Sequence, residues 1–208
     1  MEGPYLNPEL KGAMNSDYLW KPSIDSFKEM WKASEKTIKM MTISPELEGA
    51  LDVIREASFQ GVICSIGHST ASYEIVDSAI DHGAAHITHM FNAMKPINHR
   101  NPGVAVAALL RDELKIQLIA DTYHVHPATM EFLIKSKSPK GIILITDSIR
   151  VGGMHEGEQT QFSDQKVTLS GNKAVMEDGT IAGSTLTLNK AIKNVIETTG
   201  LRLSLIHI

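Results

Sequence analysis

Short apolar runs rich in β-branched residues alternate with amphipathic stretches along residues 38 to 146. Apolar residues fill each run almost continuously, which is typical of strands that are covered on both faces. Repeated β-α units around a parallel sheet produce this form of sequence. The predicted strands are Ile38 to Ile43, Val62 to Ile66, Ala84 to Thr88, Lys115 to Ala120 and Gly141 to Thr146.

The stretches between these runs predict helices. Ser44-Pro45-Glu46 is typical of a helix cap followed by proline at the first helical position, and the apolar spacing after it closes at Gly61. Three further helices are predicted over Ala71 to Asp81, Gly103 to Arg111 and Pro127 to Ser136.

The pattern changes after residue 147. Turn signals at Gly171-Asn172 and Asp178-Gly179 predict a hairpin from Gln165 to Ala182. Ser184 is the expected cap of a last amphipathic helix, which Gly200 ends.

A polar residue follows each buried run. In a β/α barrel these positions converge on one mouth, where the chemistry is done. An open doubly wound sheet could also bring them together, but it usually carries a glycine-rich phosphate loop after its first strand, and none is visible. We therefore favour an α/β barrel. The residues after the runs are His68, His89, Asp121 with His124, and Asp147.

The two ends do not complete such a barrel. Met1-Glu2-Gly3-Pro4 resembles the exit of a strand whose body is absent, and the exits account for about six of eight strands. We expect an internal fragment, with an incomplete barrel over residues 1–202. Residues 203–208 resemble a translated library adapter, with a genuine apolar terminus as the alternative.

Composition narrows the class of protein. The chain has 208 residues, 42% of them hydrophobic, and a net charge of −4, which is ordinary for a globular protein. The absence of a basic stripe argues against nucleic acid or an anionic membrane as the main partner. The single cysteine, Cys64, lies in a buried run and indicates a core residue in a reducing compartment, so the cytoplasm is the expected location.

Three of the polar positions have the residue types of a catalytic metal site. Glu2, His68 and His89 supply one carboxylate and two imidazoles, and such a site uses about three protein ligands. Each histidine alone is more often a surface or core residue. Asp147 ends a wholly apolar run, so it should face a cation or a reacting group, or cap a helix.

Two other segments offer groups for a substrate. His124 could polarise a carbonyl or contact an anion, or it could be hydrogen-bonded within its loop. The loop from Asn92 to Arg100 offers Asn92 and Arg100 for a phosphate or carboxylate, with a solvated loop as the alternative.

Several strings match a known family in the same order along the chain. They are Glu2-Gly3-Pro4-Tyr5-Leu6-Asn7-Pro8, Lys11-Gly12-Ala13, Gly67-His68-Ser69, Thr88-His89-Met90-Phe91-Asn92-Ala93-Met94, Ala120-Asp121, His124-Val125, Thr146-Asp147 and Ala182-Gly183-Ser184. The chain resembles the N-acetylglucosamine-6-phosphate deacetylase family of the amidohydrolase superfamily, over nearly its whole length. The resemblance implies a metal-dependent (β/α)8 barrel that lacks here its N-terminal strands and the small flanking β-sandwich domain.

The resemblance also implies roles for individual residues. Glu2, His68 and His89 would bind the divalent metal, and Asp147 would be the catalytic acid and base. Arg100 would reach across a homodimer interface to the sugar phosphate. Further substrate contacts are implied for Ala13, Asn92, Ala93, Asp121, His124, Ile181, Ala182 and Gly183.

One position departs from the family pattern. Met14 stands where some members carry a substrate-binding histidine; other members also vary there, so we do not interpret Met14 as inactivating. The first barrel strand, where some members bind a second metal, is outside the chain, so one site is visible.

The implied reaction is hydrolysis of the acetamide of N-acetylglucosamine 6-phosphate in amino-sugar catabolism. Zinc is the first choice of metal, with iron, cobalt or manganese as alternatives. Two other hypotheses stay open. The chain could act on another N-acyl substrate, or it could be an inactive fragment of the deacetylase.

Overall fold

The computed structural model describes residues 1–162, 164–171 and 173–202. Two compact units make up the chain. The first comprises Met1–Lys11 and Ser16–Ile116, and the second comprises Gly12–Asn15 and the chain from Gln117 onward. The tail at residues 203–208 and the turn residue Asn172 lie outside the described residues.

The fold is α/β with a parallel sheet, as the apolar runs predict. Five strands follow one another in the order β1-β2-β3-β4-β5, and the neighbours from β1 to β4 pair in parallel. Each strand is one or two residues shorter than the run that predicts it. The strands are β1 (Met40–Ile43), β2 (Ile63–Ile66), β3 (Ala84–Ile87), β4 (Lys115–Ile119) and β5 (Ile142–Ile145).

The first residues lie beside β1. Glu2 forms an isolated parallel bridge with Thr42, and the Thr42 amide donates to the carbonyl oxygen of Met1 at 2.9 Å. The segment therefore lies beside β1, and its interpretation as the exit of a further barrel strand stays a prediction.

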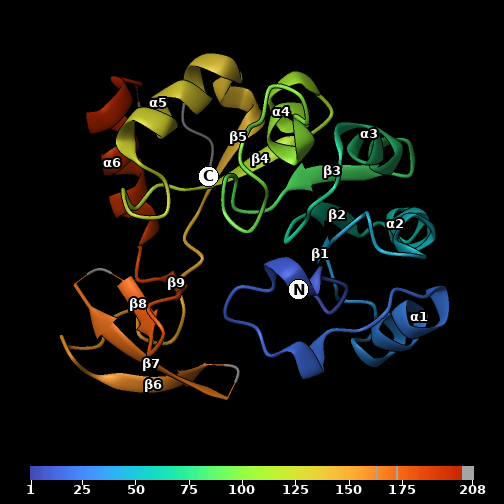
Figure 1. Cartoon of the computed structure of the whole chain (residues 1–208), viewed down its shortest axis with the longest axis horizontal. Coiled ribbons are helices and arrows are strands. Elements are labelled where there is room, and N and C mark those ends of the chain that lie inside the picture. Colours follow the sequence, from blue (N-terminus) through green and yellow to red (C-terminus); the bar gives the residue numbers. More distant parts are fainter. Residues whose placement is uncertain (163, 172, 203–208) are drawn as a thin grey trace. The chain divides into compact units, whose positions relative to one another are not determined.

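Helices accompany the strands of the first unit, with α2 (Ala50–Phe59) and α3 (Tyr73–Asp81) beside β2 and β3 (Figure 1). The predicted helix start at Ser44-Pro45 is wrong. The α2 helix begins at Ala50 behind the left-handed Gly49, because the side chains of Ser44 and Glu46 form hydrogen bonds with other segments. The prediction of α3 is confirmed, with Ser72 as its cap, and so is that of α4 (Gly103–Leu110).

One helix of this unit was not predicted. The α1 helix (Ile24–Ala33) begins at Ser23, whose hydroxyl oxygen accepts the Ser26 amide at 3.1 Å. Only Phe27 of this helix is buried. The sequence does carry a signal for it, because Ile24, Phe27 and Trp31 recur at helical spacing after the capping Ser23. Two short 3-10 turns, η1 (Pro8–Leu10) and η2 (Ser16–Tyr18), precede it.

The second unit contains α5 (Pro127–Ser136), which has its predicted bounds, a 3-10 turn η3 (Pro139–Gly141), and α6 (Leu188–Thr199). Gly200 ends α6 in the left-handed conformation, as predicted. The predicted cap at Ser184 is wrong: Thr187 precedes the helix, and Ser184 closes a strand.

A separate antiparallel sheet completes this unit (Figure 1). Its strands are β6 (Gln159–Phe162), β7 (Gln165–Ser170), β8 (Lys173–Met176) and β9 (Ile181–Ser184). The prediction of a hairpin from Gln165 to Ala182 is therefore confirmed and extended by β6. One face of this sheet carries buried apolar side chains, those of Val167, Leu169, Ala174 and Met176.

Buried hydroxyl groups connect the first three strands beneath the strand exits. The Thr88 hydroxyl lies 2.6 Å from that of Ser65 and 3.0 Å from that of Thr42. Cys64 is fully buried, as predicted, and its burial raises the pKa of the thiol to about 12. Within the described part of the chain, no helix is both long and apolar enough to cross a membrane.

Candidate metal centre

Two histidines stand two residues beyond consecutive strands. His68 follows β2 and His89 follows β3, and both have left-handed backbones, with φ of +51° and +26°. A non-glycine residue held in this region costs about 1–3 kcal/mol, so the surrounding structure must hold it there, and such residues cluster at functional sites. Asp147 repeats the pattern two residues after β5, with φ of +47°.

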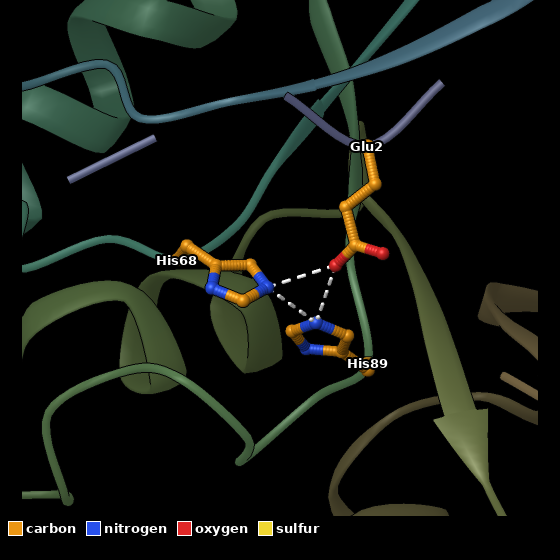
Figure 2. A group of neighbouring side chains, drawn as sticks. All are labelled: Glu2, His68 and His89. Carbon is orange, nitrogen blue, oxygen red and sulfur yellow. Dashed lines mark hydrogen bonds and ion pairs between the residues drawn. The ribbon is translucent and has the colours of Figure 1, made fainter. Parts of the chain in front are cut away.

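Glu2 and the two histidines converge on one point (Figure 2). The Glu2 Oε1 atom lies 2.8 Å from His68 Nε2 and 3.1 Å from His89 Nε2, and the two nitrogens are 3.1 Å apart. Both imidazoles are buried, while the Glu2 side chain is one third exposed. The cluster therefore opens on the side of the carboxylate.

A backbone carbonyl fixes the tautomer of His68. Its Nδ1 lies 2.7 Å from the carbonyl oxygen of Leu10, and since a carbonyl only accepts, Nδ1 carries the proton. In the neutral ring Nε2 is then an acceptor that faces the acceptor Oε1 of Glu2. A proton or a metal cation between these two acceptor atoms would remove their repulsion. A histidine whose Nδ1 donates to a carbonyl is the usual form of a metal ligand.

The charge of Glu2 also fits a site for a metal cation. Burial opposes its ionisation, but the hydrogen bonds and positive charges of His68 and His89 outweigh burial and hold the pKa of Glu2 well below its usual range. Glu2 is therefore a carboxylate at neutral pH.

The donor set fits a divalent cation. Two imidazole nitrogens and one carboxylate oxygen, all within 4.8 Å of one another, are the ligand types of a catalytic zinc site. Tetrahedral coordination with bonds of 2.0–2.1 Å requires ligand separations of about 3.3 Å. The observed separations of 2.8–3.1 Å need to widen by only a few tenths of an ångström.

The loop after His89 contains three of the predicted substrate residues. The Asn92 amide donates to the carbonyl oxygens of His89 and Met90, and the Ala93 carbonyl accepts the Ser69 amide at 3.0 Å, which joins the two histidine loops. Arg100 is exposed. Sequence reasoning did not identify Leu10, because a backbone carbonyl carries no side-chain signal.

A carboxylate–histidine pair follows β4 in the second unit. The Asp121 carboxylate accepts the His124 Nδ1 proton at 2.6 Å and the amides of Tyr123 and His124 at 2.9 and 2.8 Å. Burial would raise the pKa of Asp121, but these hydrogen bonds outweigh burial and lower it. Asp121 therefore orients the His124 ring.

Asp147 lies beside β9 in the same unit. Its carbonyl accepts the Ser184 amide at 2.9 Å, and a Cβ on Gly183 would meet the Asp147 carbonyl at 3.2 Å and Ile149 at 2.7 Å. The predicted substrate segment of Ile181, Ala182 and Gly183 is thus adjacent to the predicted acid and base. Ala13, another predicted substrate contact, is buried in the apolar cluster of this unit.

Comparison with known proteins gives consistent results. No protein-family model matches the chain. The chain is 37% identical over 199 residues to N-acetylglucosamine-6-phosphate deacetylase of Lysinibacillus sphaericus, covering 96% of this chain and 51% of that protein. The crystal structure of the Thermotoga maritima deacetylase matches with a TM-score of 0.91 at 34% identity, over 98% of this chain and 55% of that one.

The chain is thus similar, over nearly all of its own length, to N-acetylglucosamine-6-phosphate deacetylases. A Mycobacterium smegmatis member of the family, solved in complex with N-acetyl-D-glucosamine-6-phosphate, matches with a TM-score of 0.93 at 33% identity, over 98% of this chain and 53% of that chain. This chain spans about half the length of the deacetylases it matches. An Escherichia coli O157:H7 relative at 36% identity, over 96% of this chain and 52% of that protein, is named N-acetylgalactosamine-6-phosphate deacetylase.

Proposed function

We propose that this chain is part of a metal-dependent deacetylase that hydrolyses N-acetylglucosamine 6-phosphate to glucosamine 6-phosphate and acetate. The observation that carries the proposal is the convergence of Glu2, His68 and His89, whose candidate ligand atoms all lie within 4.8 Å of one another. The names of the relatives support the substrate.

The three residues would hold a divalent cation, with zinc favoured by the two-nitrogen, one-oxygen set, and iron, cobalt or manganese as alternatives. When bound, such a cation lowers the pKa of water and polarises a carbonyl oxygen. The protein supplies His68 in a fixed tautomer and Glu2 already ionised. Binding of the cation therefore requires no change in the protonation of Glu2.

Asp147 is the proposed acid and base. It would accept a proton from water as the acetyl carbonyl is attacked and return that proton to the departing amine, which leaves only when protonated. The left-handed backbone at a strand exit, shared with both histidines, supports this assignment.

His124 and Asp121 are proposed to act on the substrate as a pair. The Asp121 carboxylate holds His124 Nδ1 and so orients the ring, and His124 would present its Nε2 atom to a carbonyl or phosphate oxygen of the substrate. The loop with Asn92 and Ala93 would hold the phosphate. Arg100, which is exposed, would reach across a homodimer interface to the sugar phosphate bound in the partner subunit. Ala13 and the Ile181–Gly183 segment complete the proposed substrate contacts.

We also propose that residues 1–202 form part of a (β/α)8 barrel in the cytoplasm. The parallel pairing of β1 to β4 and the strand order β1 to β5, with Glu2 beside β1, support the barrel. The single buried cysteine supports a reducing compartment.

The test is acetate release from N-acetylglucosamine 6-phosphate by the protein that contains this chain, before and after chelation. We expect release to stop with chelator and return with Zn²⁺. Asp147→Asn should lose turnover and keep its metal, while Asp112→Asn, at an exposed turn, should behave as the unmodified protein. No release from a folded, metal-loaded protein, or normal turnover by Asp147→Asn, contradicts the proposal.

A second candidate is the same reaction on N-acetylgalactosamine 6-phosphate, which the name of the Escherichia coli O157:H7 relative favours. The two sugars differ only at one hydroxyl, so the ratio of their kcat/KM values decides between them. If the enzyme deacetylates the sugar equally well with and without its phosphate group, another N-acyl compound is the substrate.

A further inference from the structure

A carboxylate from a different connection holds the loop that contains His68. Glu46 lies between β1 and α2, and its Oε2 accepts the Ser69 hydroxyl at 2.7 Å. Its Oε1 accepts the Thr70 amide at 2.6 Å and the Thr70 hydroxyl at 3.2 Å. Glu46 therefore binds the two residues that directly follow His68.

The same carboxylate holds the segment that orients the His68 ring. Glu46 Oε1 accepts the Asn7 side-chain amide at 2.8 Å, and Asn7 Oδ1 accepts the Glu9 amide at 2.9 Å. Asn7 thereby caps η1, whose last residue, Leu10, accepts the Nδ1 proton of His68 at 2.7 Å. Glu46 thus connects to the backbone after His68 on one side and to the acceptor of its ring on the other.

His68 needs such support because its backbone is left-handed. The Ser44 hydroxyl adds to it by donating to the His68 carbonyl at 2.8 Å. The sequence Ser44-Pro45-Glu46 is typical of a helix cap. In the structure both of its polar side chains instead form hydrogen bonds with the loop that contains His68.

We propose that Glu46 is a positioning residue of the metal centre, which fixes the backbone and the tautomer of His68 for metal binding. The inference rests on the proposed function in one respect, that the cluster of Glu2, His68 and His89 binds a divalent cation. Removing a hydrogen-bonded group that supports a metal ligand typically weakens metal affinity 10–100-fold.

The test is Zn²⁺ affinity, measured on the purified protein by competition with a chromophoric chelator. We expect Glu46→Ala to weaken affinity about 10–100-fold, and Glu46→Gln, which keeps one carbonyl oxygen for Thr70 and Asn7, to weaken it less. Glu48→Ala is the matched control, since Glu48 is exposed on the same connection and pairs only with Lys21 among the contacts described. The Zn²⁺ affinity of Glu48→Ala should stay within about 2-fold of that of the unmodified protein.

Two further measurements separate positioning from a general loss of stability. The Co²⁺-loaded variant should show a changed visible absorption spectrum, and the rise in Tm that Zn²⁺ produces should be smaller than in the unmodified protein. A purely structural role would lower the Tm with and without metal equally and leave the spectrum unchanged. Asn7→Ala leaves the bonds of Glu46 to Ser69 and Thr70 in place, but it removes the Asn7 side-chain bonds to Glu46 and Thr70 and the cap of η1. It should therefore weaken Zn²⁺ binding by itself, so the outcome does not depend on one variant folding.

The outcomes distinguish the two proposals. If the unmodified protein binds Zn²⁺ no better than Glu2→Gln, the metal centre itself is refuted, and the role of Glu46 with it. If the unmodified protein binds Zn²⁺ through Glu2 while Glu46→Ala and Asn7→Ala bind it equally well, only the role of Glu46 is refuted.

Discussion

Gly67→Ala tests how closely the strand exits are packed. A Cβ at Gly67 would lie 2.6 Å from Thr88 Cβ and 2.8 Å from Thr42 Cγ2. Both distances are shorter than 3.0 Å, and Cβ atoms in proteins essentially never approach another heavy atom that closely. Neither threonine can turn away cheaply, because both are β-branched, buried and joined by their hydroxyls. Gly67 also directly precedes His68.

The expected cost follows from these contacts. Overpacking a well-packed core costs about 1–3 kcal/mol, and the loss of glycine flexibility in the unfolded chain offsets about 0.4–1 kcal/mol. We therefore expect a net cost of about 1.3 kcal/mol, or a fall in Tm of about 3–5 °C for a chain of this size. Zn²⁺ affinity should fall too, since His68 and His89 follow the displaced residues.

Thermal melts followed by circular dichroism measure the effect. Gly141→Ala is the control, because Gly141 has an ordinary φ and the nearest atoms to its added Cβ belong to one unbranched side chain, that of Lys137, at 2.9 Å from Cε. This control should change the Tm by less than about 2 °C. A Gly67→Ala protein that melts at or above the unmodified protein would refute the packing argument.

Three other predictions concern single side chains. The lowered pKa of Asp121 means that its hydrogen bonds stabilise the fold above its ordinary pKa of 3.8 and lose this effect as the pH falls; the Tm deficit of Asp121→Asn should be full at pH 7 and shrink below about pH 4. Arg111 binds the Asp77 carboxylate with two nitrogens at a partly exposed site, so Arg111→Lys should lower the Tm by about 1–3 °C in a calorimetric melt. The Cys64 thiol, with a pKa raised to about 12, should not react with a thiol reagent at pH 8 until the chain is denatured, and should then titrate as one equivalent.

The parallel sheet could be predicted because its strands are buried on both faces. Apolar runs such as 142–145 leave few alternatives to a buried strand, and the polar residue two positions later is visible as a break in the run. The candidate metal ligands His68 and His89 were found in this way, since parallel strands direct their carboxyl ends to one edge.

Polar capping signals were less reliable than apolar runs. Ser44 and Ser184 both resemble helix caps, but their hydroxyls donate to the carbonyls of His68 and Thr146. A serine hydroxyl can serve a helix end or a distant carbonyl equally well, and only the fold decides which carbonyl is near.

The buried runs and the polar residues that end the strands could be predicted from the sequence, because the apolar character of a run and the chemistry of a side chain are local properties. The tertiary structure decided the separation of the three candidate ligands, the tautomer of His68 set by Leu10, and the two-sided contact of Glu46 with Asn7 and the His68 loop. These features join residues 21 to 87 positions apart in the chain, from the His68–His89 contact to the Glu2–His89 contact. No spacing along the sequence encodes such contacts, since they exist only once the parallel strands have paired.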